Sequence, residues 1–191
     1  MHIADGIIHP GISAAAAAAS VGLVFLSGRK APLEDIPKMG LTGAALFVAS
    51  LIHIPLAGTS VHPGLYGIAG ILLGKRAFPV IFTVLLFQSL VFQHGGLLSV
   101  GVNSLNMGAG AFLAWIIWEQ KKLPEYFRAT MAGITGILIP ALLMAAEFRL
   151  SGYGRGILYL FSVYFFVALA EGVITLFIVK FFRKTKTDIL A

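Results

Sequence analysis

Residues 157–182 read ILYLFSVYFFVALAEGVITLFIVKFF, a long and almost uninterrupted apolar stretch. A helix needs about 20 predominantly apolar residues to cross the hydrocarbon core of a bilayer, so this stretch predicts a transmembrane helix. The whole sequence has the same character: 58% of its 191 residues are hydrophobic and only 12% are charged, whereas soluble domains carry about 25% charged residues. The chain is therefore predicted to be an all-α integral membrane protein, with residues 1–191 forming a single domain.

Six further apolar segments precede this stretch, and we expect each to be helical. The third of them has only nine residues, well short of a full span, so it is either a short helix shielded by its neighbours or a re-entrant piece. Together with residues 157–182, the segments predict about seven transmembrane helices. Their approximate bounds are Gly11–Ser27, Leu41–Gly58, Leu65–Leu73, Phe78–Gln93, Leu105–Trp118 and Ala129–Glu147.

The basic residues between these segments predict the orientation of the chain. Of the 14 lysine and arginine residues, all but Arg149 and Arg155 fall in one set of connections, and such an excess marks the cytoplasmic side. The N-terminus is then outside and the C-terminus cytoplasmic, which requires an odd number of crossings. The net charge of +6 therefore indicates topology and not nucleic-acid binding. The cytoplasmic set is Arg29, Lys30, Lys38, Lys75, Arg76, Lys121, Lys122, Arg128, Lys180, Arg183, Lys184 and Lys186.

The chain begins MHIADG, and a free N-terminus followed directly by histidine can chelate a metal ion. The terminal amine of Met1, the amide nitrogen of His2 and an imidazole nitrogen of His2 can close two small rings on one ion. A further histidine would complete a plane of four nitrogens, which suits Ni(II) or Cu(II) and, by extension, Co(II). The alternative is a frayed chain end. Asp5 and the lack of a basic segment before the alanine run at 14–19 argue against a cleaved signal peptide.

All five histidines belong to the outer half of the chain, with His2, His9, His62 and His94 near span ends and His53 deeper in the second span. Imidazole is the commonest protein ligand for late first-row metals. In the connection AGTSVHPG, residues 57–64, Pro63 biases His62 away from helix. His62 is therefore a candidate fourth nitrogen, the alternative being an ordinary turn histidine. With no cysteine in the chain, thiolate sites are excluded.

The segment HGGLLSVGVNSLNMG, residues 94–108, is expected to be non-helical backbone at membrane depth, which is tolerated where it lines a cavity. A flexible outer loop is the alternative. Four polar residues near the histidines are candidates to orient the metal ligands, namely Ser60, His94, Asn103 and Asn106. Glu171 is a functional candidate because a carboxylate within a span is expensive. Ala45 and Ala49, four residues apart, are a candidate face for close contact with another helix.

MHIADG, GTSVHPG, HGGLLSVGVNSLNMG and the later LAEGVI occur in the order in which similar motifs occur in the CbiM/NikM permeases. The chain resembles these substrate-binding components of energy-coupling-factor cobalt and nickel transporters over nearly its whole length. The resemblance implies that Ni(II) or Co(II) is the transported substrate, held by the Met1 amine, the His2 amide and imidazole nitrogens and His62. It implies no catalytic cofactor, and it includes neither His9 nor His53 among the ligands.

The resemblance also implies partners and a location. The partners would be a transmembrane coupling protein, touching the Ala45 and Ala49 face, two cytoplasmic ATPases and, as a further candidate, a small accessory membrane protein. The location would be the cytoplasmic membrane of a bacterium or archaeon. The chain lacks the phosphate-binding pattern GxxxxGK[ST], so ATP hydrolysis would belong to another chain.

Two other functions remain open from the residues alone. The first is a stand-alone small-solute permease, although the chain shows no internal repeat of the kind that many carriers have. The second is an intramembrane metal-dependent enzyme that uses the outer histidines, although the chain has neither HExxH nor GxSxG. A transport subunit, not an enzyme, is the function we expect.

Overall fold

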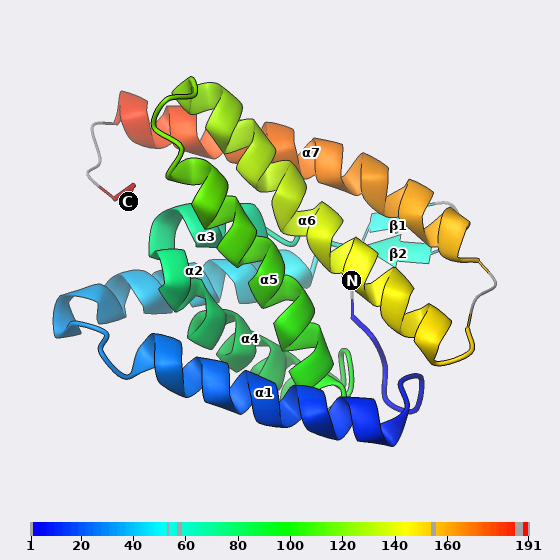
Figure 1. The fold of residues 1–191 in the computed structure, drawn as a ribbon. Coiled ribbons are helices and arrows are strands. Elements are labelled where there is room, and N and C mark those ends of the chain that lie inside the picture. The colour runs from blue at the N-terminus through cyan, green and yellow to red at the C-terminus, as the bar shows by residue number, and fades with distance from the viewer. Residues whose placement is uncertain (1, 53, 57–58, 154–155, 186–188, 191) are drawn as a thin grey trace.

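The structure is a computed structural model, and it describes residues 2–52, 54–56, 59–153, 156–185 and 189–190. Within these residues the chain forms seven α-helices, two single-turn 3-10 helices and one short antiparallel ribbon (Figure 1). The helices are α1 (Pro10–Gly28), α2 (Ile36–Ser50), α3 (Tyr66–Leu73), α4 (Ala77–Phe92), α5 (Val100–Trp118), α6 (Glu125–Leu150) and α7 (Ile157–Lys184). The 3-10 helices are η1 (Leu33–Asp35) and η2 (Gly74–Arg76), and the strands are β1 (Ile54–Leu56) and β2 (Thr59–Val61).

The predicted multi-pass membrane character is confirmed. Five stretches of the described chain are long and apolar enough to cross a bilayer, namely 10–28, 66–92, 100–118, 125–150 and 157–184. Helix α2 has 15 residues and is shorter than a full span. The expected seven crossings and the expected orientation of the termini are not decided by these lengths.

The short third segment is a helix buried by its neighbours. All eight residues of α3 are buried, and they form the centre of the main apolar cluster together with residues of α4, α5 and α6. Its backbone lies very close to α6, because a Cβ added to Gly67 would come within 2.6 Å of the Cα of Gly133. This packing agrees with a short helix shielded by its neighbours, and whether the segment crosses the membrane stays a prediction.

The second segment departs from the prediction at its C-terminal end. It was expected to continue to Gly58, but α2 ends at Ser50 and residues 54–56 pair with 59–61 as β1 and β2, with Pro55 opposite Ser60. The physical reason is Pro55, which cannot donate a backbone hydrogen bond and biases the preceding residue towards extended backbone. Strand β2 ends at Val61, so His62 is the first residue after the ribbon.

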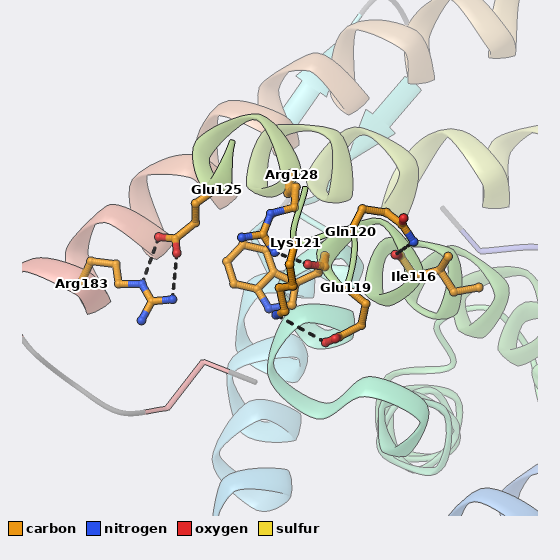
Figure 2. Close-up of polar contacts among 8 residues, drawn as sticks. Ile116, Glu119, Gln120, Lys121, Glu125, Arg128 and Arg183 are labelled. Atoms are coloured by element: carbon orange, nitrogen blue, oxygen red, sulfur yellow. Dashed lines mark hydrogen bonds and ion pairs between the residues drawn. The ribbon is translucent and has the colours of Figure 1, made fainter. Parts of the chain in front are cut away.

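One end of the bundle is held together by charged side chains (Figure 2). Arg183 near the end of α7 binds both carboxylate oxygens of Glu125 at the start of α6, at 3.0 and 2.8 Å. The guanidinium of buried Arg128 lies over the ring of Trp118 at 4.6 Å and donates to its backbone carbonyl. Arg128 and Arg183 both belong to the basic set that the sequence assigns to the cytoplasm.

Candidate metal centre

Three imidazoles from three distant parts of the chain meet at one point. His2 precedes α1, His62 follows β2 and His94 follows α4, and one ring nitrogen of each lies within 4.8 Å of the others. The Nε2 atom of His62 is 3.2 Å from the Nδ1 atom of His2, and the rings of His2 and His94 lie edge to face with centroids 4.1 Å apart. Such a cluster of nitrogen donors can hold a transition-metal ion.

A chain of hydrogen bonds fixes which nitrogen of His2 carries its proton. Ser50 donates to the carbonyl of Phe47, at 2.6 Å, so its hydroxyl oxygen accepts the amide N–H of Gln88, also at 2.6 Å. The amide oxygen of Gln88 then faces the Nε2 atom of His2 at 3.0 Å. Because that oxygen can only accept, Nε2 carries the proton and the lone pair of His2 lies on Nδ1. Nδ1 therefore points its lone pair towards His62.

The N-terminal segment is docked into the bundle by Asn103 of α5. The amide oxygen of Asn103 accepts the backbone N–H of Ile3 at 2.8 Å, and its amide nitrogen donates to the carbonyl of Ile3 at 3.0 Å. Ile3 is only 1% exposed and packs in an apolar cluster with residues of α1, α5 and α6. The Asn103 side chain thus pairs with both backbone groups of Ile3, as a neighbouring β-strand would. The two hydrogen bonds fix the backbone next to His2.

Asp5 provides a second anchor for the same segment. Its carboxylate accepts the backbone N–H groups of Leu98 and Ser99, at 3.2 and 2.8 Å, and the hydroxyl of Ser99 donates to the carbonyl of Ala4. The loop that carries His94 and the segment that carries His2 therefore hold each other.

The segment at residues 94–108 is partly helical, which corrects the prediction of non-helical backbone. Helix α5 begins at Val100, so Asn103 and Asn106 lie on it and only the first residues of the segment form a loop. Packing explains the difference, because Gly101 lies against the backbone of α1, where an added Cβ would come within 2.5 Å of Ala17. Tertiary contact overrides the weak helix propensity of glycine and asparagine.

The other residues proposed from the sequence lie in different surroundings. His94 joins the imidazole cluster, while buried Asn106 donates a hydrogen bond to Glu147 at 2.7 Å. His9 caps α1, its Nδ1 accepting the N–H of Gly11. On α2, Ala45 is exposed and Ala49 is buried within this chain, and their role as a contact face stays a prediction. Met1, His53 and the side chain of Ser60 lie outside the described residues.

Ser50, Gln88 and Ser99 belong to the site and were not singled out from the sequence. Gln88 binds His2 across 86 positions of the chain, and its signal was a polar amide inside an otherwise apolar helical segment, six residues before His94. Ser99 donates hydrogen bonds to Asp5 and Ala4. A serine in a loop is common, so nothing in the local sequence indicated this role. Such long-range partners cannot be read from local patterns.

Electrostatics favour a neutral, metal-binding form of His2. Burial lowers the pKa of this imidazole well below its ordinary value of 6.5, and neighbouring positive charge, including that on His62 and His94, lowers it further. A lowered pKa keeps the ring free of a second proton at neutral pH. The Nδ1 lone pair is therefore available to a cation.

The chain is similar to transport proteins of bacteria and to a transporter of known structure. A cobalt transport protein CbiM from Geobacter sulfurreducens is 33% identical over all of this chain and 62% of its own length. A fused nickel transport protein NikMN from Rhodobacter capsulatus is 34% identical over 78% of this chain and 47% of its own length. The chain thus spans from about half to three fifths of these relatives. A truncated transition-metal transporter of known crystal structure has the same fold, with a TM-score of 0.85, 24% identity, and coverage of 97% of this chain and 99% of that one.

The fold and the site define a class: a multi-pass helical membrane protein with a cluster of imidazoles beside its N-terminus. Within that class the chain belongs to the CbiM family, described as the cobalt uptake substrate-specific transmembrane region, whose family model matches residues 2–189.

Proposed function

We propose that this protein is the substrate-capturing membrane subunit of an ATP-driven cobalt or nickel uptake transporter, and that it binds the metal ion at its outer face. The observation that carries the proposal is the convergence of His2, His62 and His94, with the lone pair of His2 Nδ1 directed towards His62. The relatives named as cobalt and nickel transport proteins support the same substrate class. They are named as transport proteins, which favours a transport subunit over an enzyme.

The proposed site is rich in nitrogen. The Met1 amine and the His2 amide and imidazole nitrogens would chelate the ion, with His62 as the fourth donor. Only Nδ1 of His2 can close a six-membered ring with the amide nitrogen of the same residue, and Nδ1 is the atom that the hydrogen bond to Gln88 leaves unprotonated. His94 lies close enough to contribute a further imidazole. A preformed set of nitrogens selects Ni(II) or Co(II) by geometry, where raw affinity cannot.

The partners and the location follow from the same proposal. Residues 1–191 would form one permease domain with seven crossings, N-terminus outside and C-terminus inside, in the cytoplasmic membrane of a bacterium or archaeon. A coupling protein, two ATPases and, as a further candidate, a small accessory membrane protein would complete the transporter. The face of α2 that carries Ala45 and Ala49 would lie at the contact with the coupling protein, with Ala45 exposed on it. The fused relative NikMN supports a transporter of several components, because its name joins two transport components in one chain.

Metal binding and uptake test the proposal directly. We expect the purified protein, with its native N-terminus, to bind Ni(II) or Co(II) with 1:1 stoichiometry in isothermal titration calorimetry. We expect vesicles to accumulate radioactive metal only when the coupling protein and ATPases are present with ATP. Accumulation by this chain alone would support the stand-alone permease instead, and absence of binding to both ions would overturn the proposal.

Metal affinity is expected to fall as pH decreases from 8 to 5, because protons compete with the metal for the same nitrogens. The terminal amine, with an ordinary pKa of about 7.7–8.0, accounts for a shallow first decline. Protons compete for His2 only at the acidic end of this range, because burial lowers the pKa of its imidazole in the folded protein well below 6.5. The apo fold also loses stability below pH 6.5, because unfolded His2 binds the proton more readily. Calorimetric titrations at half-unit intervals measure the profile, and a flat one would contradict it.

A further inference from the structure

A carboxylate of the last helix reaches the loop that carries His62. Glu171 lies near the middle of α7 and is 1% exposed. One carboxylate oxygen accepts the backbone N–H of Gly64 at 2.6 Å, and both oxygens lie 3.2–3.3 Å from the backbone N–H of Leu65. These two peptide groups follow His62 by two and three residues. The bond to Gly64 spans 107 positions of the chain.

The loop needs this acceptor because it has an unusual backbone. Leu65 has a φ of +52° and precedes the first turn of α3 without any side-chain cap of its own. A non-glycine residue rarely adopts this left-handed conformation. The first N–H groups of a helix lack partners within the helix and favour negative charge nearby. Glu171 supplies the hydrogen-bond acceptor for this end of the helix.

Close packing leaves the loop little room to shift. A Cβ on Gly64 would lie 2.6 Å from the Cδ1 of Ile137 and 2.7 Å from the ring of Tyr66. On the other side, α7 is pressed against α6, where a Cβ on Gly133 would lie 2.6 Å from the carbonyl oxygen of Glu171. The carboxylate therefore joins two backbones that are themselves fixed. His62 is only 6% exposed, and it begins the segment that this contact holds.

We propose that Glu171 is a positioning residue of the metal site, which sets the place of His62 through the peptide N–H groups of Gly64 and Leu65. The inference rests on the proposed function, since it assumes that His62 is a metal ligand. It assigns to α7 a part in metal capture, although α7 contributes no member of the imidazole cluster in the described part of the chain. Glu171 itself does not touch the metal.

The decisive variant is Glu171→Gln. The carboxamide keeps the size of the side chain, but its NH₂ group cannot accept a hydrogen bond and would face a backbone N–H. We expect Kd for Ni(II) or Co(II) to rise at least tenfold, and the visible absorption spectrum of bound Co(II) to change because one ligand is displaced. Thr175→Val is the matched control. Thr175 lies one turn further along α7, is fully buried and has a hydroxyl without a hydrogen-bond partner, so its loss should change Kd less than twofold.

A double-mutant cycle separates positioning from a general effect on the fold. If Glu171 acts through His62, Glu171→Gln should have less than a twofold further effect in a His62→Ala background. Wild-type affinity and spectrum in Glu171→Gln would overturn the inference, as would an undiminished effect in that background. Glu171→Asp, which keeps the carboxyl group but withdraws the acceptor by one methylene, provides the same test if the glutamine variant does not fold. Failure of the wild type to bind metal would instead overturn the proposed function.

Discussion

Replacing His2 with alanine is expected to weaken Ni(II) and Co(II) binding more than a hundredfold, which corresponds to about 2.7 kcal/mol. The imidazole of His2 is the centre of the site, because it lies beside both other imidazoles and is held by Gln88. Its removal deletes one ligand and opens the six-membered ring that would make the chelate tight. Calorimetric titration of the purified variant measures the loss.

The matched control is His9→Ala. His9 is also an N-terminal histidine, but it is exposed and its Nδ1 accepts the N–H of Gly11 at the start of α1. Losing this cap should destabilise the helix by about 1 kcal/mol and leave metal affinity unchanged. If the two variants bound metal equally well, the proposed ligand role of His2 would be wrong. A variant with one residue inserted before Met1 tests the amine separately, and wild-type affinity in it would exclude the amine as a ligand.

The fold was predictable where apolar residues run without interruption. Residues 157–182 are predicted as one helix, and α7 covers 157–184, because a bilayer-length apolar segment has few alternatives to a helix. Prediction was wrong at the start of α5, where glycine and asparagine lie inside a helix. Gly101 and Asn103 suggest a loop, yet Gly101 packs against the backbone of α1 and Asn103 binds Ile3. Their partners are supplied by the folded chain and are not visible in the local sequence.

In the candidate site, too, some residues could be predicted from the local sequence and others could not. His2 and His62 could be proposed from local chemistry, a histidine at a free terminus and a histidine fixed before proline, and they lie side by side. The roles of Gln88 and Glu171 depend on contacts 86 and 107 positions away. Glu171 could be flagged as a costly buried carboxylate, but only the three-dimensional structure shows that it holds the backbone behind His62. The physical cost of a buried polar group thus identifies a functional candidate before its role is known.

The second large effect is expected at Gly96, whose substitution by alanine should release the N-terminal segment. Gly96 has a φ of +76°, and a Cβ there would overlap the carboxyl group and backbone nitrogen of Asp5. Asp5 would have to leave the N–H groups of Leu98 and Ser99, and the anchor between the His2 segment and the His94 loop would be lost. We expect Kd for the metal to rise more than tenfold, about 1.4 kcal/mol, when it is measured by calorimetry.

Gly152→Ala provides the matched control for this prediction. Gly152 has a φ of +86°, but no atom lies within 4 Å of the position that its Cβ would take. Both substitutions carry the backbone strain of a left-handed alanine, about 1–2 kcal/mol, and only the one at Gly96 also collides with the docked segment. A loss of metal affinity in Gly96→Ala but not in Gly152→Ala would show that docking of the N-terminal segment, and not the backbone strain that the two variants share, sets the affinity. An unchanged Kd in Gly96→Ala would show that the ligands assemble without the Asp5 anchor. In that case the two-way hydrogen bond between Asn103 and Ile3 would be sufficient to hold His2 in place.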